Sequence, residues 1–168
     1  MGINKPHNKR LHRTLCSSEN EVKFEIIPNV GAGPILLGMS RDEVKNILGK
    51  TYHSGSSKNS EYYFKNSIQV EFLEGKADFI GLSYSRDYVV TYLGNNVFNT
   101  EATELFTIIS KQEKEIHKYD SYEYLFPEQV ITLWDADEQY DYIGNGVRNI
   151  WAQVGVGSLS YLNAVKKA

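Results

Sequence analysis

The chain has 168 residues, of which 41 % are hydrophobic, and a formal net charge of −3. This is close to the common size of one domain and is enough for a packed core. The single cysteine, Cys16, excludes an internal disulfide, and the absence of a run of about 18 apolar residues excludes a membrane-spanning helix.

The charge is distributed unevenly along the chain. Residues 1–20 carry four basic residues and one acidic residue, whereas the remaining 148 carry 14 basic and 20 acidic residues, a net charge of −6. We expect residues 1–20 to form a disordered basic tail, either a solvated extension, a product of a wrongly chosen start codon, or an arm for nucleic acid or a membrane surface. The acidic remainder disfavours nucleic-acid binding outside the tail and favours a basic partner.

The composition of residues 1–20 also predicts where in the cell the protein is located. It has no apolar stretch after its basic residues, so we expect no secretory signal, no lipidation of Cys16 and a cytoplasmic protein. Residues 8–14 resemble short tails of bacterial reading frames beside mobile gene cassettes, which suggests an uncharacterised bacterial cassette protein.

Residues 21–86 are predicted to form a first α+β unit. A strand from Val22 is followed by a Gly/Pro loop at residues 28–34 and an apolar run at residues 35–37. Ser40 and Glu43 have the spacing of a capping box, and the helix that follows should stop at Gly49.

The rest of this unit is predicted to be a loop and three strands. The loop covers residues 54–60, and the strands cover residues 62–64, 68–73 and 79–85, with Gly75 in a hairpin turn between the last two.

Residues 87–168 are predicted to repeat this order as a second unit, which either stands beside the first or forms one compact domain with it. A strand at residues 88–93 precedes a helix capped by Asn99 or Thr100 and running to about His117. Strands follow at residues 122–126, 130–134 and 150–156, with an extra loop at residues 135–149. The chain would end in a short helix or a frayed tail.

Few side chains have the spacing of a catalytic or metal site. No local signature joins a nucleophile to His53 or His117, and the loop at residues 31–34 lacks the phosphate-binding pattern. We therefore predict no catalytic residues, no cofactor and no metal ligands, and a protein that is not an enzyme.

The strongest candidate for a site is the acidic and aromatic segment around the predicted loop. Acidic and aromatic side chains together suit a basic protein surface, because aromatic anchors dominate interface energies. The alternative for the two tryptophans is that both are core residues of neighbouring strands. The candidate interface residues are Asp135, Asp137, Asp141, Tyr140, Tyr142, Trp134 and Trp151.

The block from Gly33 to Gly49, with its G-M-S-x-x-E-V centre, resembles the opening of domains in the BamE/SmpA and beta-lactamase-inhibitor-protein group. The resemblance covers residues 33–85 closely and residues 86–157 by the order of elements. It implies a capped helix followed by a three-stranded antiparallel sheet. In the inhibitor proteins two such units join their sheets into a concave face that grips a partner protein. A similar opening appears in small cytoplasmic proteins of toxin–immunity and mobile-element loci.

The sequence therefore predicts an α+β protein of two tandem β-α-β-β-β units, with antiparallel sheets and helices on one face. The leading functional hypothesis is a non-catalytic protein-binding module of inhibitor or immunity type, using a sheet face and the acidic loop. The alternative is a small-ligand- or metal-binding protein or enzyme in which Asp137, Asp141 and His117 converge on one pocket.

Overall fold

The computed structural model describes residues 21–140 and 147–168, and no side chain between residues 137 and 146. The helices are α1 (Arg41–Leu48), α2 (Ala102–Ser110) and α3 (Leu159–Lys167), with short 3-10 helices η1 (Lys50–Tyr52) and η2 (Val97–Asn99). The strands are β1 (Val22–Ile27), β2 (Gly31–Ala32), β3 (Ile35–Leu36), β4 (His53–Ser56), β5 (Ser60–Tyr63), β6 (Ile68–Leu73), β7 (Lys76–Leu82), β8 (Tyr88–Tyr92), β9 (Asn95–Asn96), β10 (Glu123–Phe126), β11 (Ile131–Tyr140) and β12 (Val147–Gly157). The predicted basic tail lies outside the described residues.

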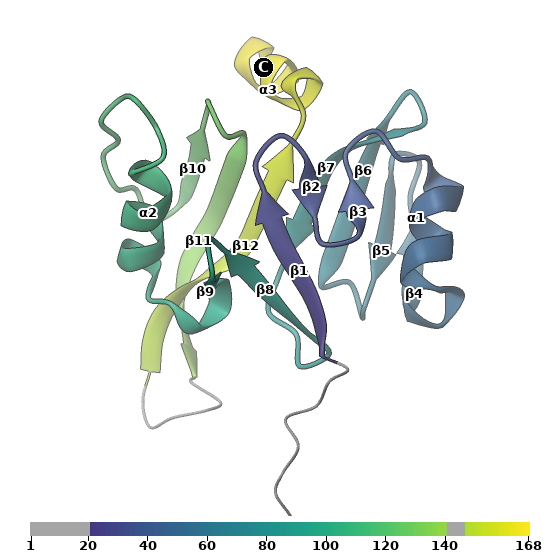
Figure 1. The fold of residues 1–168 in the computed structure, drawn as a ribbon, viewed down its shortest axis with the longest axis horizontal. Coiled ribbons are helices and arrows are strands. Elements are labelled where there is room, and N and C mark those ends of the chain that lie inside the picture. The colour runs from purple at the N-terminus through teal and green to yellow at the C-terminus, as the bar shows by residue number, and fades with distance from the viewer. Residues whose placement is uncertain (1–20, 141–146) are drawn as a thin grey trace, which may run out of the picture.

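Two sheets organise the strands, and both draw on the two halves of the chain (Figure 1). The smaller sheet has the order β3-β2-β1-β8-β9, and the larger has the order β10-β11-β12-β7-β6-β5-β4. β1 pairs in parallel with β8, while β7 pairs antiparallel with β12. The protein is thus of the α+β class, as predicted.

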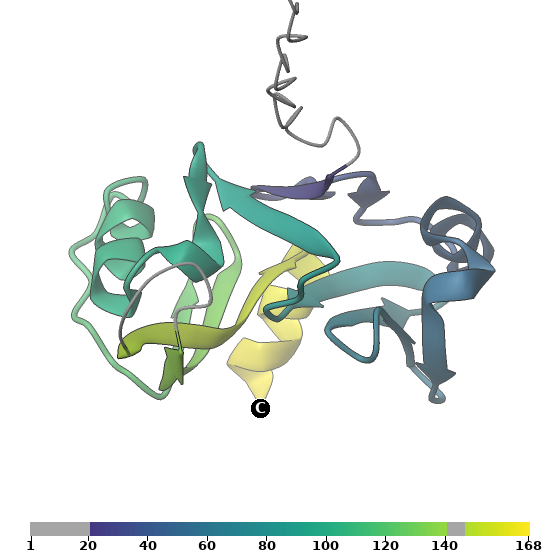
Figure 2. The same cartoon turned by 90° about the horizontal axis from the view of Figure 1, so that it is seen from below.

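The elements lie in layers around the larger sheet (Figure 2). The smaller sheet covers the middle of one face, with α1 and α2 beside it at the two ends of the molecule. α3 lies against the opposite face, where Tyr161 stacks on Phe79 of β7 with ring centroids 4.6 Å apart. The expected position on one face therefore describes α1 and α2, whereas α3 covers the other.

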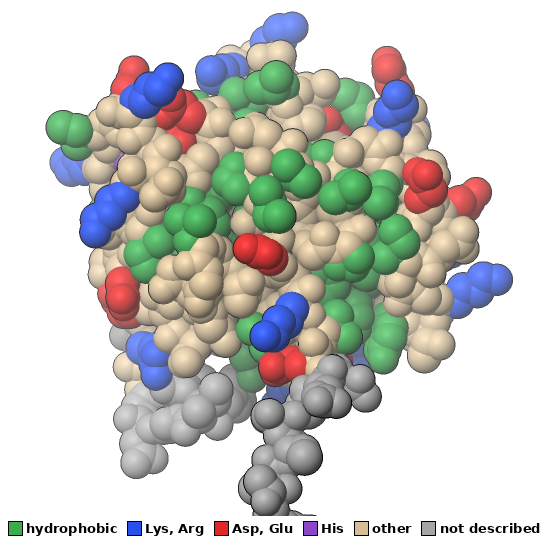
Figure 3. Space-filling view, viewed as in Figure 1, with side chains coloured by type: hydrophobic (Ala, Val, Ile, Leu, Met, Phe, Trp, Pro, Cys, Tyr) green, Lys and Arg blue, Asp and Glu red, His purple; other side chains and the backbone are tan. Residues whose placement is uncertain are grey.

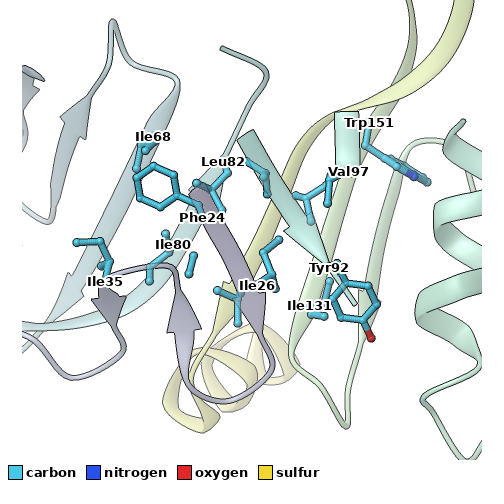
Figure 4. Close-up of a cluster of buried hydrophobic side chains, with 14 of the residues drawn as sticks. Phe24, Ile26, Ile35, Ile68, Ile80, Leu82, Tyr92, Val97, Ile131 and Trp151 are labelled. Atoms are coloured by element: carbon cyan, nitrogen blue, oxygen red, sulfur yellow. The ribbon is translucent and has the colours of Figure 1, made fainter. Parts of the chain in front are cut away.

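The core fills the space between the two sheets (Figure 4). Phe24 and Ile26 of β1 point toward Ile80 and Leu82 of β7, and each of these side chains is at most 2 % exposed. Burying side chains of this size stabilises the fold by roughly 1.5–3 kcal/mol each. Because β1 belongs to the first half and covers strands of both halves, the two halves share one core.

The predicted first helix is confirmed in detail. Ser40 Oγ accepts a hydrogen bond from the Glu43 amide at 3.2 Å, and Glu43 Oε2 accepts one from the Ser40 amide at 2.7 Å. Gly49 ends the helix with a φ of 86°, a conformation that favours glycine. The hairpin between β6 and β7 likewise turns at Glu74 and Gly75, which have φ of 50° and 77°.

The second helix is shorter than predicted, because α2 ends at Ser110 rather than near His117. Its cap is also different: Glu101 occupies the N-cap position without a side-chain hydrogen bond, while the Thr100 hydroxyl donates to the Asn96 carbonyl. After Ser110 the chain turns so that the buried Glu113 carboxylate accepts hydrogen bonds from residues 128 and 129. A tertiary contact therefore overrides the local tendency to continue the helix.

Two segments predicted as loops are largely strands. β4 occupies residues at the start of the predicted loop 54–60, and β11 and β12 extend into the predicted loop 135–149. In this second segment Ala136 to Tyr140 pair with residues of β12, up to Tyr140 opposite Val147. These polar residues lack the apolar alternation that marks a strand, so their extended form depends on pairing across the hairpin.

Candidate binding surface

Most of the predicted interface residues lie along the β11–β12 hairpin. Trp134, Asp135, Asp137 and Tyr140 belong to β11, and Trp151 belongs to β12. The structure describes the backbone but not the side chains of Asp137 and Tyr140. The remaining two, Asp141 and Tyr142, lie outside the described residues.

The two tryptophans have opposite environments. Trp151 is 1 % exposed, and its Nε1–H donates to the Ala102 carbonyl of α2 at 3.0 Å. Trp134 is 47 % exposed. The core alternative therefore describes Trp151, which is closed to a partner, whereas Trp134 remains available to one.

A break in strand alternation separates the two rings. Trp151 and Val154 are both buried, although residues three apart on a regular strand face opposite sides of the sheet. The break lies across from Asp135, whose φ of 48° is unusual for a residue other than glycine. This local distortion lets Trp151 reach α2 while Trp134 stays on the solvent face.

Strand pairing defines the surroundings of Trp134. Residues directly opposite each other in an antiparallel sheet share a face, with Cβ atoms about 5 Å apart. Trp134 is opposite Glu123 of β10 on one side and Gln153 of β12 on the other, and Leu125 is opposite Thr132. We call this face the Trp134 surface, formed by Glu123, Leu125, Thr132, Trp134 and Gln153.

The Trp134 surface continues toward α3. Thr132 is opposite Gly155 of β12. The Phe79 ring lies directly over Gly155, so that a Cβ atom there would overlap it, and Tyr161 of α3 stacks on the same ring. Burial raises the pKa of Tyr161 to about 12, and the charges of Glu71, Glu123 and Asp78 act in the same direction. Three carboxylates, including Glu123 of the Trp134 surface, therefore lie close enough to Tyr161 to disfavour its ionisation.

Sequence reasoning found Trp134 but missed its neighbours. Glu123, Leu125 and Gln153 stand far from residues 134 and 135 in the sequence, and no motif marks them. The predicted strands at residues 122–126 and 130–134 do form a hairpin, but its register, with Phe126 opposite Ile131, is what aligns Glu123 with Trp134.

A second exposed apolar area lies on the outer face of the smaller sheet (Figure 3). Ile27, Val30, Leu36 and Leu93 are each 44–57 % exposed there. This surface contains no exposed tryptophan, and its Leu36 matches Trp134 closely in exposure at 44 %. It therefore provides a comparison site for mutations of the Trp134 surface.

A polar cluster on the inner side of β4 and β5 has the residue types of a catalytic triad but not its geometry. Glu61 Oε2 and Ser56 Oγ both meet His53 Nε2, at 2.6 Å and 3.1 Å, whereas a triad uses the two different ring nitrogens. The Ser56 hydroxyl donates to Glu61 at 2.5 Å, and Arg41 Nη1 donates to the other Glu61 oxygen at 2.8 Å. The cluster joins α1 to the β4–β5 hairpin through the Arg41–Glu61 ion pair.

This cluster makes stability depend on acid pH. Burial disfavours the charge of Glu61, but hydrogen bonds from Ser56, His53 and Arg41 together outweigh it and lower the pKa below the ordinary 4.5. A lowered folded-state pKa means that the charged carboxylate stabilises the fold above pH 4.5, and that this contribution is lost as the pH falls through the folded-state pKa.

We expect the Glu61→Gln variant to lose stability mainly near neutral pH. The difference from the unmodified protein in free energy of unfolding should be largest above about pH 5 and should shrink toward about pH 3. Urea unfolding followed by circular dichroism at each pH measures it. A difference that stays constant across this range would show that the charge of Glu61 is unimportant.

His117, one member of the alternative site, lies in a closed environment. Its side chain is 9 % exposed, its Nδ1 lies 2.6 Å from the Tyr124 hydroxyl, and its Nε2 lies 3.6 Å from Glu113 Oε1. Tyr124 and Glu113 therefore hold the His117 ring in a buried polar network. Its convergence with Asp137 and Asp141 stays a prediction, because those side chains are outside the described part.

Between residues 21 and 136 and in 147–168, no three His, Cys, Asp or Glu side chains lie together as a metal ion would require. In the same part of the chain, no helix has the length and apolar character needed to cross a bilayer.

Comparisons with models of protein families, with curated proteins and with solved structures found no match to this chain. The resemblance of residues 33–85 to the BamE/SmpA and beta-lactamase-inhibitor-protein group therefore stays a prediction.

Proposed function

We propose that the protein is a non-catalytic protein-binding module, of inhibitor or immunity type, whose contact surface is the Trp134 surface and the adjoining end of the β11–β12 hairpin. The observation that carries the proposal is Trp134, an indole 47 % exposed on a sheet face beside a carboxylate. Leaving such a side chain in water forgoes a large gain from burial, and tryptophan is enriched among the residues that dominate binding energies.

The architecture supports the same proposal. The resemblance implies two units whose joined sheets grip a partner, and the larger sheet here combines strands of both halves through the β7–β12 pair. Glu123 and Asp135 beside Trp134 favour a partner with basic groups. The acidic residues Asp137 and Asp141, which the sequence predicts to belong to the interface, would extend this complementarity.

We expect Trp134→Ala to weaken partner binding by tenfold or more, about 1.4 kcal/mol, while leaving the fold intact. The full-length protein serves as bait in a lysate of its source cells, at low and high salt, and captured proteins are quantified by mass spectrometry. Leu36→Ala is the matched control, because it removes an equally exposed apolar side chain from the other sheet. Equal capture by the two variants would exclude the Trp134 surface as the interface.

The acidic residues are tested in the same assay. Reversing the charge of Asp135, Asp137 and Asp141 to lysine should reduce capture at low salt and flatten its salt dependence. Unchanged capture and an unchanged salt response would remove the hairpin end from the interface.

A further inference from the structure

One edge of the larger sheet ends next to the Trp134 surface. The strand order places β10 last, and no strand among the described residues pairs with its outer side. Backbone groups along a sheet edge are a ready template for another extended chain. A partner that docks on the Trp134 surface can therefore also form backbone hydrogen bonds with β10.

The pairing pattern identifies the free backbone groups. In an antiparallel pair, alternate residues direct both backbone groups toward the partner strand and the others direct them away. The Asp135 amide donates to the Tyr122 carbonyl at 2.6 Å, so Tyr122 and Tyr124 face β11. Glu123 and Leu125 therefore direct their N–H and C=O groups outward, and the described part of the chain provides them with no hydrogen-bond partner.

The other edges are less suited to accept a strand. The pairing of β4, at the opposite end of the same sheet, shifts register between His53 and Gly55, and such irregularities blunt an edge. The edges of the smaller sheet are β3 and β9, which have two residues each. β10 therefore offers the regular edge that lies beside an exposed tryptophan.

The charge near β10 selects among possible strands. Glu123 is exposed and stands in the same cross-strand row as Trp134. A strand added about 4.8 Å beyond β10 would place every second side chain on this face of the sheet, and one of them directly beside the Glu123 carboxylate. Arginine there can pair with Glu123 and extend toward the indole face, which attracts cations. The basic residues of α3, Lys166 and Lys167, are in its last turn. The residues just before them, 164 and 165, line a pocket together with Asn59 and Ser60, which belong to the end of the sheet opposite β10.

We propose that β10 binds an extended basic segment of the partner as an additional strand, with arginine or lysine at alternate positions over Glu123 and Trp134. This inference rests on the proposed function and names the class of ligand that its site takes. Main-chain hydrogen bonds to Glu123 and Leu125 supply affinity, and the row of Glu123 and Trp134 selects the charge.

The test uses a proline that blocks the edge without breaking the sheet. Because the Glu123 amide points away from β11, Glu123→Pro removes one outward donor and leaves the β10–β11 hydrogen bonds in place. Glu123→Ala loses the same carboxylate and keeps the amide. Circular dichroism and the melting temperature establish that both variants fold.

The probe is a fluorescent octapeptide that alternates arginine and valine, measured by anisotropy with the full-length protein. We expect saturable binding, and we expect Glu123→Pro to bind about tenfold more weakly than Glu123→Ala. The same peptide with alternate backbone nitrogens methylated should not bind, and a glutamate–valine peptide should not bind either. Equal binding by the proline and alanine variants, or no saturation by the arginine peptide, would overturn strand addition.

The lysate assay separates this inference from the proposed function. If Trp134→Ala reduces partner capture while Glu123→Pro and Glu123→Ala capture equally, the interface is correct and the strand addition is wrong. If Trp134→Ala captures as much as Leu36→Ala, the proposed function itself fails.

Discussion

Trp151→Ala is expected to reduce the free energy of unfolding by about 3–5 kcal/mol. The indole is 1 % exposed, and the substitution removes a large buried volume together with the hydrogen bond from Trp151 Nε1 to the Ala102 carbonyl. The ring also lies against Tyr119, at 6.0 Å between centroids, so the loss extends to the segment after α2. Urea unfolding followed by circular dichroism measures the change.

Trp134→Ala is the matched control for this prediction. It removes the same side chain from the solvent face of the same hairpin, where it is 47 % exposed, and should cost less than about 1 kcal/mol. Trp151→Phe keeps a ring in the core and should fall between the two. If both alanine variants lost the same stability, the different roles assigned to the two tryptophans would be wrong.

Glu113→Ala is expected to destabilise the protein by about 3 kcal/mol or more. The Glu113 carboxylate is fully buried and accepts hydrogen bonds from the amides of Glu128 and Gln129, at 3.1 Å and 3.2 Å, and from Gln129 Nε2 at 3.0 Å. Removing it leaves the amides of Glu128 and Gln129 without this acceptor, whereas Gln129 Nε2 keeps its hydrogen bond to the Ile109 carbonyl. Thermal and urea unfolding measure the loss.

Glu113→Gln separates the shape of this side chain from its charge. The amide keeps one acceptor oxygen, but its NH₂ group must then face a donor, so an intermediate loss is expected. The Tyr92 hydroxyl donates to Gln129, and burial raises the pKa of Tyr92 to about 12, with the charge of Glu113 adding to it. Glu113→Gln should therefore also lower the pKa of Tyr92, which ultraviolet titration of tyrosine can detect. An unchanged tyrosine titration and an unchanged stability would remove Glu113 from the network.

Together these variants separate stability from binding. Trp151 and Glu113 hold α2 and the segment after it against β10 to β12, whereas Trp134 and Glu123 lie on the outer side of the same strands. Substitutions in the first pair should lower stability, and substitutions in the second pair should lower affinity alone. This division between a packed inner face and an exposed outer face is what the proposed protein-binding function predicts.

Local signals in the sequence were sufficient wherever the physical cause is local. The helix from Arg41 to Leu48 begins and ends where its capping box and Gly49 place it, because these hydrogen bonds and backbone angles involve residues at most four positions apart. The β6–β7 hairpin was equally readable from Gly75. The α+β class followed from the order of such segments.

Contacts between distant residues decided the rest. α2 stops at Ser110 because Glu113 binds the backbone at residues 128 and 129, and the polar residues 136–140 are extended because β12 pairs with them. The candidate site shows the same division. Composition drew attention to the aromatic and acidic hairpin, but only the tertiary structure, through the distortion at Asp135 and the packing of α2, buried Trp151 and left Trp134 exposed beside Glu123.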